Sequence, residues 1–174
     1  VPFPDKWLSF RPYGYIYCYV SICRSTSVSA SVIHGVLPEE SARLSTLWAI
    51  LGQPASGIAV PYWPVTKPPT VADGNPTASL CDLANQIRAL LFDYPENTAY
   101  LDSYKLLDGT GGGLWTKTFP AEDSIFTAAD AKLNQWRDGS FSLQEMVETE
   151  VSLANYAYYT LLDAYNAMLT PIAS

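Results

Sequence analysis

The sequence has 174 residues, a formal net charge of −7 at pH 7 and a hydrophobic fraction of 48%. A chain of this length can bury one full hydrophobic core, so we expect a single domain. The negative charge disfavours sequence-independent binding to nucleic acid or anionic lipid. Glycines and prolines interrupt the apolar stretch 44–63, which is therefore too broken for a membrane-spanning helix. We expect no nucleic-acid partner and no membrane span.

The first third of the chain has the pattern of β-strands. Tyrosines alternate with aliphatic residues over residues 13–23, which predicts a first strand, and a second is predicted over 26–36. Two more strands, 44–51 and 57–63, flank a short connection. A helix is the alternative for 44–51, because a short apolar run is compatible with both structures.

Small and hydroxyl side chains fill one face of the second predicted strand. With a period of two, Ile33 shares this face with Ser25, Ser27, Ser29 and Ser31. The other face carries Thr26, Val28, Ala30, Val32, His34 and Val36. Because serine and alanine let a second layer approach closely, we expect this strand to be packed between two layers.

Helical patterns follow the proline-rich segment 64–78. Helices are predicted over 79–92, 122–137 and 142–168, with capping boxes formed by Ser79 with Asp82 and by Ser142 with Glu145. Strands followed by helices predict an α+β fold with an antiparallel sheet and C-terminal helices. We divide the chain into a strand-rich sheet portion (1–63), a proline-rich connection (64–78) and a helical portion (79–174) that packs on the same domain.

The last predicted helix is about 40 Å long at about 1.5 Å per residue, more than a domain of this size should be wide. Its apolar stripe includes Tyr158 and Tyr165, whereas Tyr156 and Tyr159 lie off the stripe. The glutamates at its start suit the positive end of the helix dipole and predict a solvated face: Glu145, Glu148 and Glu150. We expect part of this helix to contact a second surface.

Familiar catalytic motifs are not found. One histidine, His34, excludes histidine-rich metal sites, and the nearest serines lie on the opposite face of its strand. Cys18 and Cys23 would face opposite sides of one strand and cannot bridge, whereas a pairing of Cys81 with either stays open. The glycine-rich segment 109–113 lacks the Lys-Ser/Thr of a phosphate-binding loop and predicts a flexible loop or lid. We expect neither a metal nor a cofactor.

Arg24 stands at the entry to the second predicted strand. An arginine that enters a buried strand needs a carboxylate or an anionic ligand to offset its desolvation. Two interpretations stay open, a structural ion pair and a pocket residue.

The segments RSTSVSASVIHGV (24–36) and LSTLWAILGQPASGIAVPYW (44–63) resemble the C-terminal half of penicillin acyltransferase-like proteins, the linear-amide branch of the N-terminal nucleophile (Ntn) hydrolases. The resemblance covers residues 13–92. It implies a four-layer αββα sandwich to which this chain contributes a sheet and flanking helices. It also implies an autoprocessed hydrolase or acyltransferase that attacks a linear amide or thioester with an N-terminal cysteine.

Val1 stands where such a nucleophile would be, and the asparagine strand of the oxyanion hole is not found. The resemblance therefore implies that the catalytic residues lie on a missing N-terminal half or a second subunit. Arg24, Thr26 and Trp48 are candidates for a pocket that takes a small amide or acyl substrate. Some relatives suggest a secreted or periplasmic setting.

A second hypothesis is a non-catalytic binding or structural module. Tyr13, Tyr15, Tyr17 and Tyr19 share one face of the first predicted strand. Tyrosine combines apolar area with a polar tip, so such a row suits a carbohydrate or a protein partner, or a buried face. Exposure of the rings distinguishes these possibilities.

Overall fold

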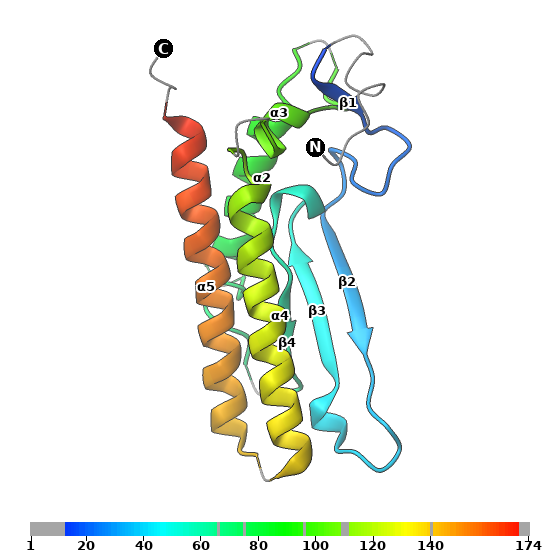
Figure 1. The fold of residues 1–174 in the computed structure, drawn as a ribbon, viewed down its shortest axis with the longest axis vertical. Helices are drawn as coiled ribbons and strands as arrows, with labels where there is room; N and C mark the ends of the chain where they lie inside the picture. Colours follow the sequence, from blue (N-terminus) through cyan, green and yellow to red (C-terminus); the bar gives the residue numbers. More distant parts are fainter. Residues whose placement is uncertain are drawn as a thin grey trace.

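The computed structural model describes residues 13–65, 67–74, 76–95, 97–108, 112–139 and 141–170. These residues form a mixed α+β structure with two small antiparallel sheets and C-terminal helices (Figure 1), as the order of patterns in the sequence predicted. Residues 109–111, most of the predicted glycine-rich loop, lie outside the described residues. None of the described helices combines the length and the apolar character needed to cross a bilayer.

The larger sheet has the order β2 (Ser29–His34), β3 (Thr46–Leu51), β4 (Val60–Tyr62). The predicted strands are confirmed here, and the helical alternative for residues 44–51 is wrong. Val32 pairs with Trp48 and Ile33 with Leu47, which confirms the alternation of faces along β2.

The second predicted strand is not packed between two layers. Val32 and Ile33 point to opposite faces of β2, yet 67% and 76% of their surfaces are exposed. In Figure 1, β2 lies at the outer edge of the sheet, on the side away from α4 and α5. Within the described residues, neither of these two side chains is buried.

The smaller sheet pairs β1 (Tyr15–Tyr17) with β5 (Tyr100–Asp102). The first strand is shorter than predicted, because the chain turns at Cys18, whose carbonyl accepts hydrogen bonds from the backbone N–H and the hydroxyl of Ser21. Strand β5 was not predicted. All three cysteines are free thiols.

Helix α2 (Ser79–Leu91) confirms the first predicted helix, but its predicted capping box is wrong. Ala78 is the N-cap residue, no side chain caps the helix, and Ser79 is already helical. The helix forms through its apolar stripe, whose members are almost completely buried: Leu80, Leu83, Ala84, Ile87 and Leu91. The short helix α3 (Ser103–Leu106) follows β5.

Helix α4 (Trp115–Asp138) begins seven residues before the predicted start and contains Pro120. A proline inside a helix removes a helical hydrogen bond and disfavours the helix locally. The burial of Leu114 and Thr118 fixes the first turns nevertheless, and the indole N–H of Trp115 donates to the carbonyl of Ala55 at 3.1 Å. Tertiary packing outweighs the local preference.

Helix α5 (Leu143–Leu169) begins as predicted, with the Ser142 hydroxyl accepting from the backbone N–H of Glu145 at 3.1 Å. Its stripe is confirmed, because Tyr158 and Tyr165 are half-buried, whereas Tyr156 and Tyr159 are exposed. The predicted solvated face is wrong for Glu150, of which 2% is exposed.

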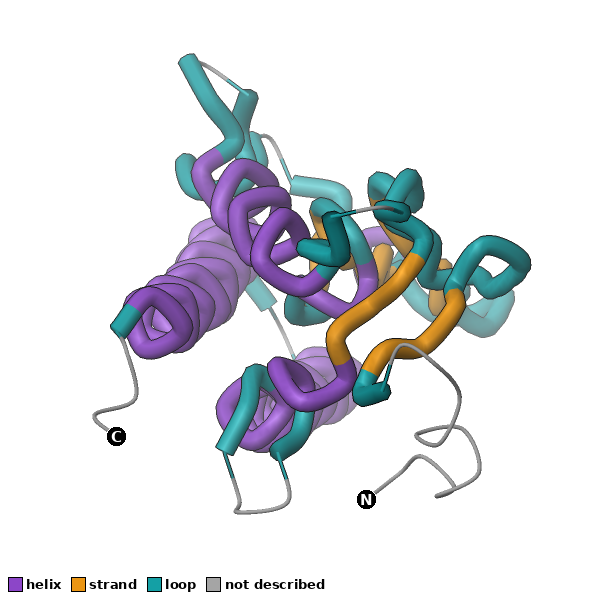
Figure 2. Tube along the Cα trace, turned by 90° about the horizontal axis from the view of Figure 1, so that it is seen from above, coloured by secondary structure: helices purple, strands orange, loops and turns teal. Residues whose placement is uncertain are grey.

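The three long helices lie on one side of the molecule and the strands on the other (Figure 2). Helix α5 packs against α4, α2 and β4, so β4 is the strand nearest the helices. The core contains the stripes of all three helices and the buried side chains of Val60 and Trp63. The ring of Trp63 meets that of Trp136 edge-on, with 5.0 Å between centroids.

Candidate functional site

Five tyrosines form a continuous group of rings around the smaller sheet; we call it the tyrosine cluster, Tyr15, Tyr17, Tyr19, Tyr94 and Tyr100. Neighbouring ring centroids are 5.1 Å apart for Tyr15 and Tyr94, 5.3 Å for Tyr94 and Tyr100, and 5.1 Å for Tyr100 and Tyr17. Tyr17 and Tyr19 are nearly parallel, with 16° between their planes. The sheet register creates the group, because it places Tyr17 opposite Tyr100.

The outer rings of the cluster are open to solvent, while its inner end is anchored. Tyr17 is 50% and Tyr19 64% exposed. At the inner end the hydroxyl of Tyr15 donates to Asp93 at 3.2 Å, and Asp93 also pairs with Lys105. Burial and the charge of Asp93 raise the pKa of Tyr15 above its ordinary value, so this ring stays neutral.

A cavity of about 370 Å³ lies beside Tyr19. Its wall is rich in hydrogen-bonding groups and is formed by Cys18, Tyr19, Arg24, Ser25, Thr26, Asn97, Thr98 and Ala99. The structure thus brings two of the predicted pocket residues, Arg24 and Thr26, into one site. Its volume lies within the range of small-molecule sites.

Two hydrogen bonds hold the Arg24 segment in place. The guanidinium of Arg88 on α2 donates to the carbonyl of Ser25 at 2.6 Å. The backbone N–H of Arg24 donates to the hydroxyl of Ser27 at 3.1 Å. On the opposite wall, the side-chain carbonyl of Asn97 accepts from the N–H of Ala99 at 2.9 Å, and its NH₂ group, which has no acceptor among the described residues, is a donor for a ligand.

Arg24 is exposed and precedes β2 rather than lying inside a buried strand. Within the described residues no carboxylate lies within ion-pair distance of its guanidinium. Of the two interpretations left open by the sequence, the position favours the pocket residue. Its five N–H donors are available to a ligand.

Trp48, the third predicted pocket residue, lies in a different cavity of about 350 Å³ between the β2–β3 pair and α4. Its indole packs against the ring of Phe126, with 4.5 Å between ring centroids and the planes tilted by 53°. Apart from Ser31, the lining is apolar: Ala30, Val32, Trp48, Ile50, Ala59 and Phe126. The structure therefore does not unite Trp48 with Arg24 and Thr26.

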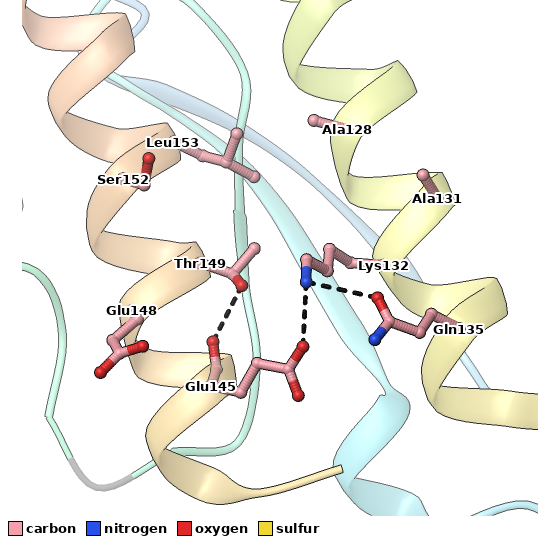
Figure 3. Close-up of a pocket in the computed structure, with 9 residues that line it drawn as sticks. All are labelled: Ala128, Ala131, Lys132, Gln135, Glu145, Glu148, Thr149, Ser152 and Leu153. Carbon is pink, nitrogen blue, oxygen red and sulfur yellow. Dashed lines mark hydrogen bonds and ion pairs between the residues drawn. The ribbon is translucent and has the colours of Figure 1, made fainter. Parts of the chain in front are cut away.

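A groove of about 430 Å³ lies between α4 and α5 (Figure 3). The ammonium of Lys132 in this groove contacts the carboxylate of Glu145 at 2.9 Å and the amide oxygen of Gln135 at 3.3 Å. The hydrogen bond from Lys132 lowers the pKa of Glu145. Because Lys132 and Glu145 are paired with each other, neither charge is left unpaired to bind a ligand in the groove.

Cys18 and Cys23 do not have the lowered pKa of an activated nucleophile. Burial raises the pKa of the Cys18 and Cys23 thiols, which lowers their thiolate fraction. The part of the chain that the structure describes also contains no group of three or more His, Cys, Asp or Glu residues placed to hold a metal ion.

Comparisons of the chain with protein-family models, curated proteins and solved structures found no match.

Sequence reasoning missed Tyr94, Asn97 and Tyr100, which complete the site. The segment that holds them has no strand alternation, and its contribution depends on the pairing of β1 with β5, about 85 residues away along the chain. The two tyrosines of this segment, Tyr94 and Tyr100, were its one feature in the sequence that pointed to the site.

Proposed function

We propose that this chain is a non-catalytic carbohydrate-binding module. An oligosaccharide would lie on the exposed rings of Tyr17 and Tyr19 and extend into the cavity that contains Arg24, which we call the Arg24 cavity. The observation that carries the proposal is this junction, because Tyr19 belongs to the tyrosine cluster and also lines the cavity.

The two halves of the site match the two sides of a sugar. A pyranose has an apolar C–H face, which packs on an aromatic ring, and a rim of hydroxyls, which needs hydrogen-bonding partners. The rings of Tyr17 and Tyr19 supply the first surface. Arg24, Asn97 and the threonine hydroxyls of the Arg24 cavity supply donors and acceptors for the second. Arg24 adds a positive charge suited to a carboxylate-bearing sugar.

Binding to an array of neutral and acidic oligosaccharides, followed by calorimetric titration of the hits, tests the proposal. Tyr19→Ala should lose about tenfold or more in affinity, equivalent to about 1.4 kcal/mol. Tyr159→Ala is the matched control, because Tyr159 on α5 is also 64% exposed but lies outside the cluster. The proposal fails if no oligosaccharide binds at millimolar concentration, or if both variants lose affinity equally.

A second candidate function follows from the family resemblance: the chain is the C-terminal portion of an Ntn-type amide hydrolase or acyltransferase, part of a four-layer sandwich with its nucleophile elsewhere. The apolar cavity at Trp48 favours it, because an acyl chain suits such a lining. The exposed faces of β2 are what a sheet lacking its partner layer would present. N-terminal sequencing and intact mass of the natural protein test it. A native polypeptide that starts at Val1, with no partner chain and no upstream cysteine, contradicts it.

A further inference from the structure

The two edge strands of the larger sheet differ in whether their outward backbone N–H groups have hydrogen-bond acceptors. On β4, the outward backbone positions are Ala59, Pro61 and Trp63, because Val60 and Tyr62 face β3. The N–H of Ala59 donates to Glu122 on α4 at 2.7 Å, and that of Trp63 donates to Glu150 on α5 at 2.8 Å. Pro61 has no N–H. Every outward N–H of this edge is therefore satisfied or absent.

The β2 edge has no such protection. The N–H of Gly52 donates to the carbonyl of Val28. Because backbone groups alternate in direction along a strand, the N–H and C=O groups of the even-numbered residues of β2 point toward β3. The N–H and C=O groups of Ser29, Ser31 and Ile33 consequently point outward. No hydrogen-bond partner for them is found within the described residues. Unpaired strand edges of this kind accept another strand.

We propose that β2 pairs antiparallel with β2 of a second copy of this chain, with Val32 on the two-fold axis. An axis at Val32 aligns the outward groups, because Ser31 then exchanges hydrogen bonds with Ile33 of the second copy. It also brings the two exposed Val32 side chains together in a non-hydrogen-bonded pair, where β-branched side chains pack closely.

The distribution of charged residues around β2 is compatible with pairing between two copies of the chain. From Ser25 to Pro38 the sequence contains no Asp, Glu, Lys or Arg, so two copies meet there without repulsion despite the net charge of −7. Arg24 lies before β2 and Glu39 lies after it, both exposed and without an ion pair within the described residues. Antiparallel pairing places Arg24 of one copy at the same end as Glu39 of the other, so opposite charges flank the new sheet.

Analytical ultracentrifugation over a range of concentrations tests the proposal with the full chain. The wild type should sediment as a reversible dimer. Val32→Lys places two ammonium groups opposite each other on the axis and should raise the dimer dissociation constant about tenfold or more. Val20→Lys is the matched control, because Val20 is 86% exposed and lies outside β2; it should leave the dimer intact.

A second variant tests the backbone directly. Ser31→Pro removes an outward N–H without removing a bond to β3, as Pro61 does on the opposite edge, and should also give a monomer. Circular dichroism of each variant verifies that it is folded. A monomeric wild type, or a dimer that persists in folded Val32→Lys and Ser31→Pro, overturns the proposal. Neither result bears on the tyrosine cluster, whose test is sugar binding.

Discussion

The backbone N–H of Trp63 donates to the carboxylate of Glu150 at 2.8 Å, joining the end of β4 to the second turn of α5 across 87 positions of sequence. Glu150 is 2% exposed, and no cation lies within ion-pair distance of it among the described residues. Burial raises the pKa of Glu150 from 4.5 to about 7, although the bond from Trp63 lowers it. The neighbouring hydroxyl of Tyr62 is buried and has no hydrogen-bond partner among the described residues, and burial and the charge of Glu150 raise its pKa.

Glu150→Gln should stabilise the protein at neutral and alkaline pH. The folded-state pKa of about 7 lies above the unfolded value near 4.5, so this group favours folding below pH 4.5 and its contribution falls as the pH rises through 7. At about 1.36 kcal/mol per pKa unit, the loss reaches about 3 kcal/mol. Glutamine keeps an acceptor for Trp63 and does not titrate. In urea unfolding, the free energy of unfolding of Glu150→Gln relative to that of the wild type should increase from pH 4 to pH 8.

Glu150→Leu is the control for the hydrogen bond. It removes the charge and also leaves the N–H of Trp63 without an acceptor, which costs about 1–3 kcal/mol. It should therefore be less stable than Glu150→Gln at every pH. A difference between wild type and Glu150→Gln that does not change with pH contradicts the raised pKa.

Gly52→Ala should lower the free energy of unfolding by about 2 kcal/mol or more. Gly52 has a φ of +98°, which L-residues with a Cβ rarely adopt, and an added Cβ would lie 2.6 Å from the Cβ of Ala84. Gly35→Ala is the matched control, because a Cβ there meets nothing within 4 Å; its effect should stay within about 0.5 kcal/mol. Equal effects in chemical denaturation would show that the turn after β3 is not constrained as described.

Arg88→Met should weaken ligand binding, although Arg88 does not line the Arg24 cavity and acts only by holding its wall. Its guanidinium holds the carbonyl of Ser25 at 2.6 Å and so fixes the wall of the Arg24 cavity. Losing a charged hydrogen bond of this kind should cost about 1.5–3 kcal/mol of stability, measured by thermal unfolding. Arg43→Met is the control, since Arg43 is exposed and its guanidinium makes no hydrogen bond or ion pair within the described residues. A variant that loses neither stability nor affinity contradicts this role for Arg88.

Lys132→Met should change stability little. Its ion pair with Glu145 is partly exposed, with 37% and 31% of the two side chains accessible, and pairs of this kind contribute little in water. The pKa of Glu145, measured by NMR, should rise toward its ordinary value because the lowering hydrogen bond is lost. A large loss of stability would instead show that the groove between α4 and α5 depends on this pair.

The local sequence pattern predicted the helices and strands whose own residues show a regular apolar pattern. Helices α2 and α5 have apolar residues at the spacing that buries them, and the strands of the larger sheet were found from the alternation along β2 and the short apolar runs of β3 and β4, so the positions of these elements could be read from the sequence. The start of α4 could not, because it depends on where Leu114 and Trp115 pack rather than on the local preference of Pro120.

The site was predictable only in part, for the same reason. Arg24 and Thr26 are close in sequence and share a cavity, whereas Trp48 separates from them because the β2–β3 pairing directs it to α4. Glu150 lies two residues from the exposed Glu148, and its buried position brings it to the N–H of Trp63, a distant residue. Such contacts depend on segments far apart in the chain, and a single sequence contains no signal for them.

Chemical-shift mapping by ¹H–¹⁵N NMR tests the central claim most directly. On titration with an oligosaccharide that the array identifies, the backbone amides that shift most should be those of Tyr17, Tyr19, Arg24 and Asn97, and Tyr19→Ala should move the titration to about tenfold higher ligand concentration or beyond. Shifts confined to the cavity at Trp48, or to the groove between α4 and α5, would contradict the proposal that the tyrosine cluster and the Arg24 cavity form the binding site.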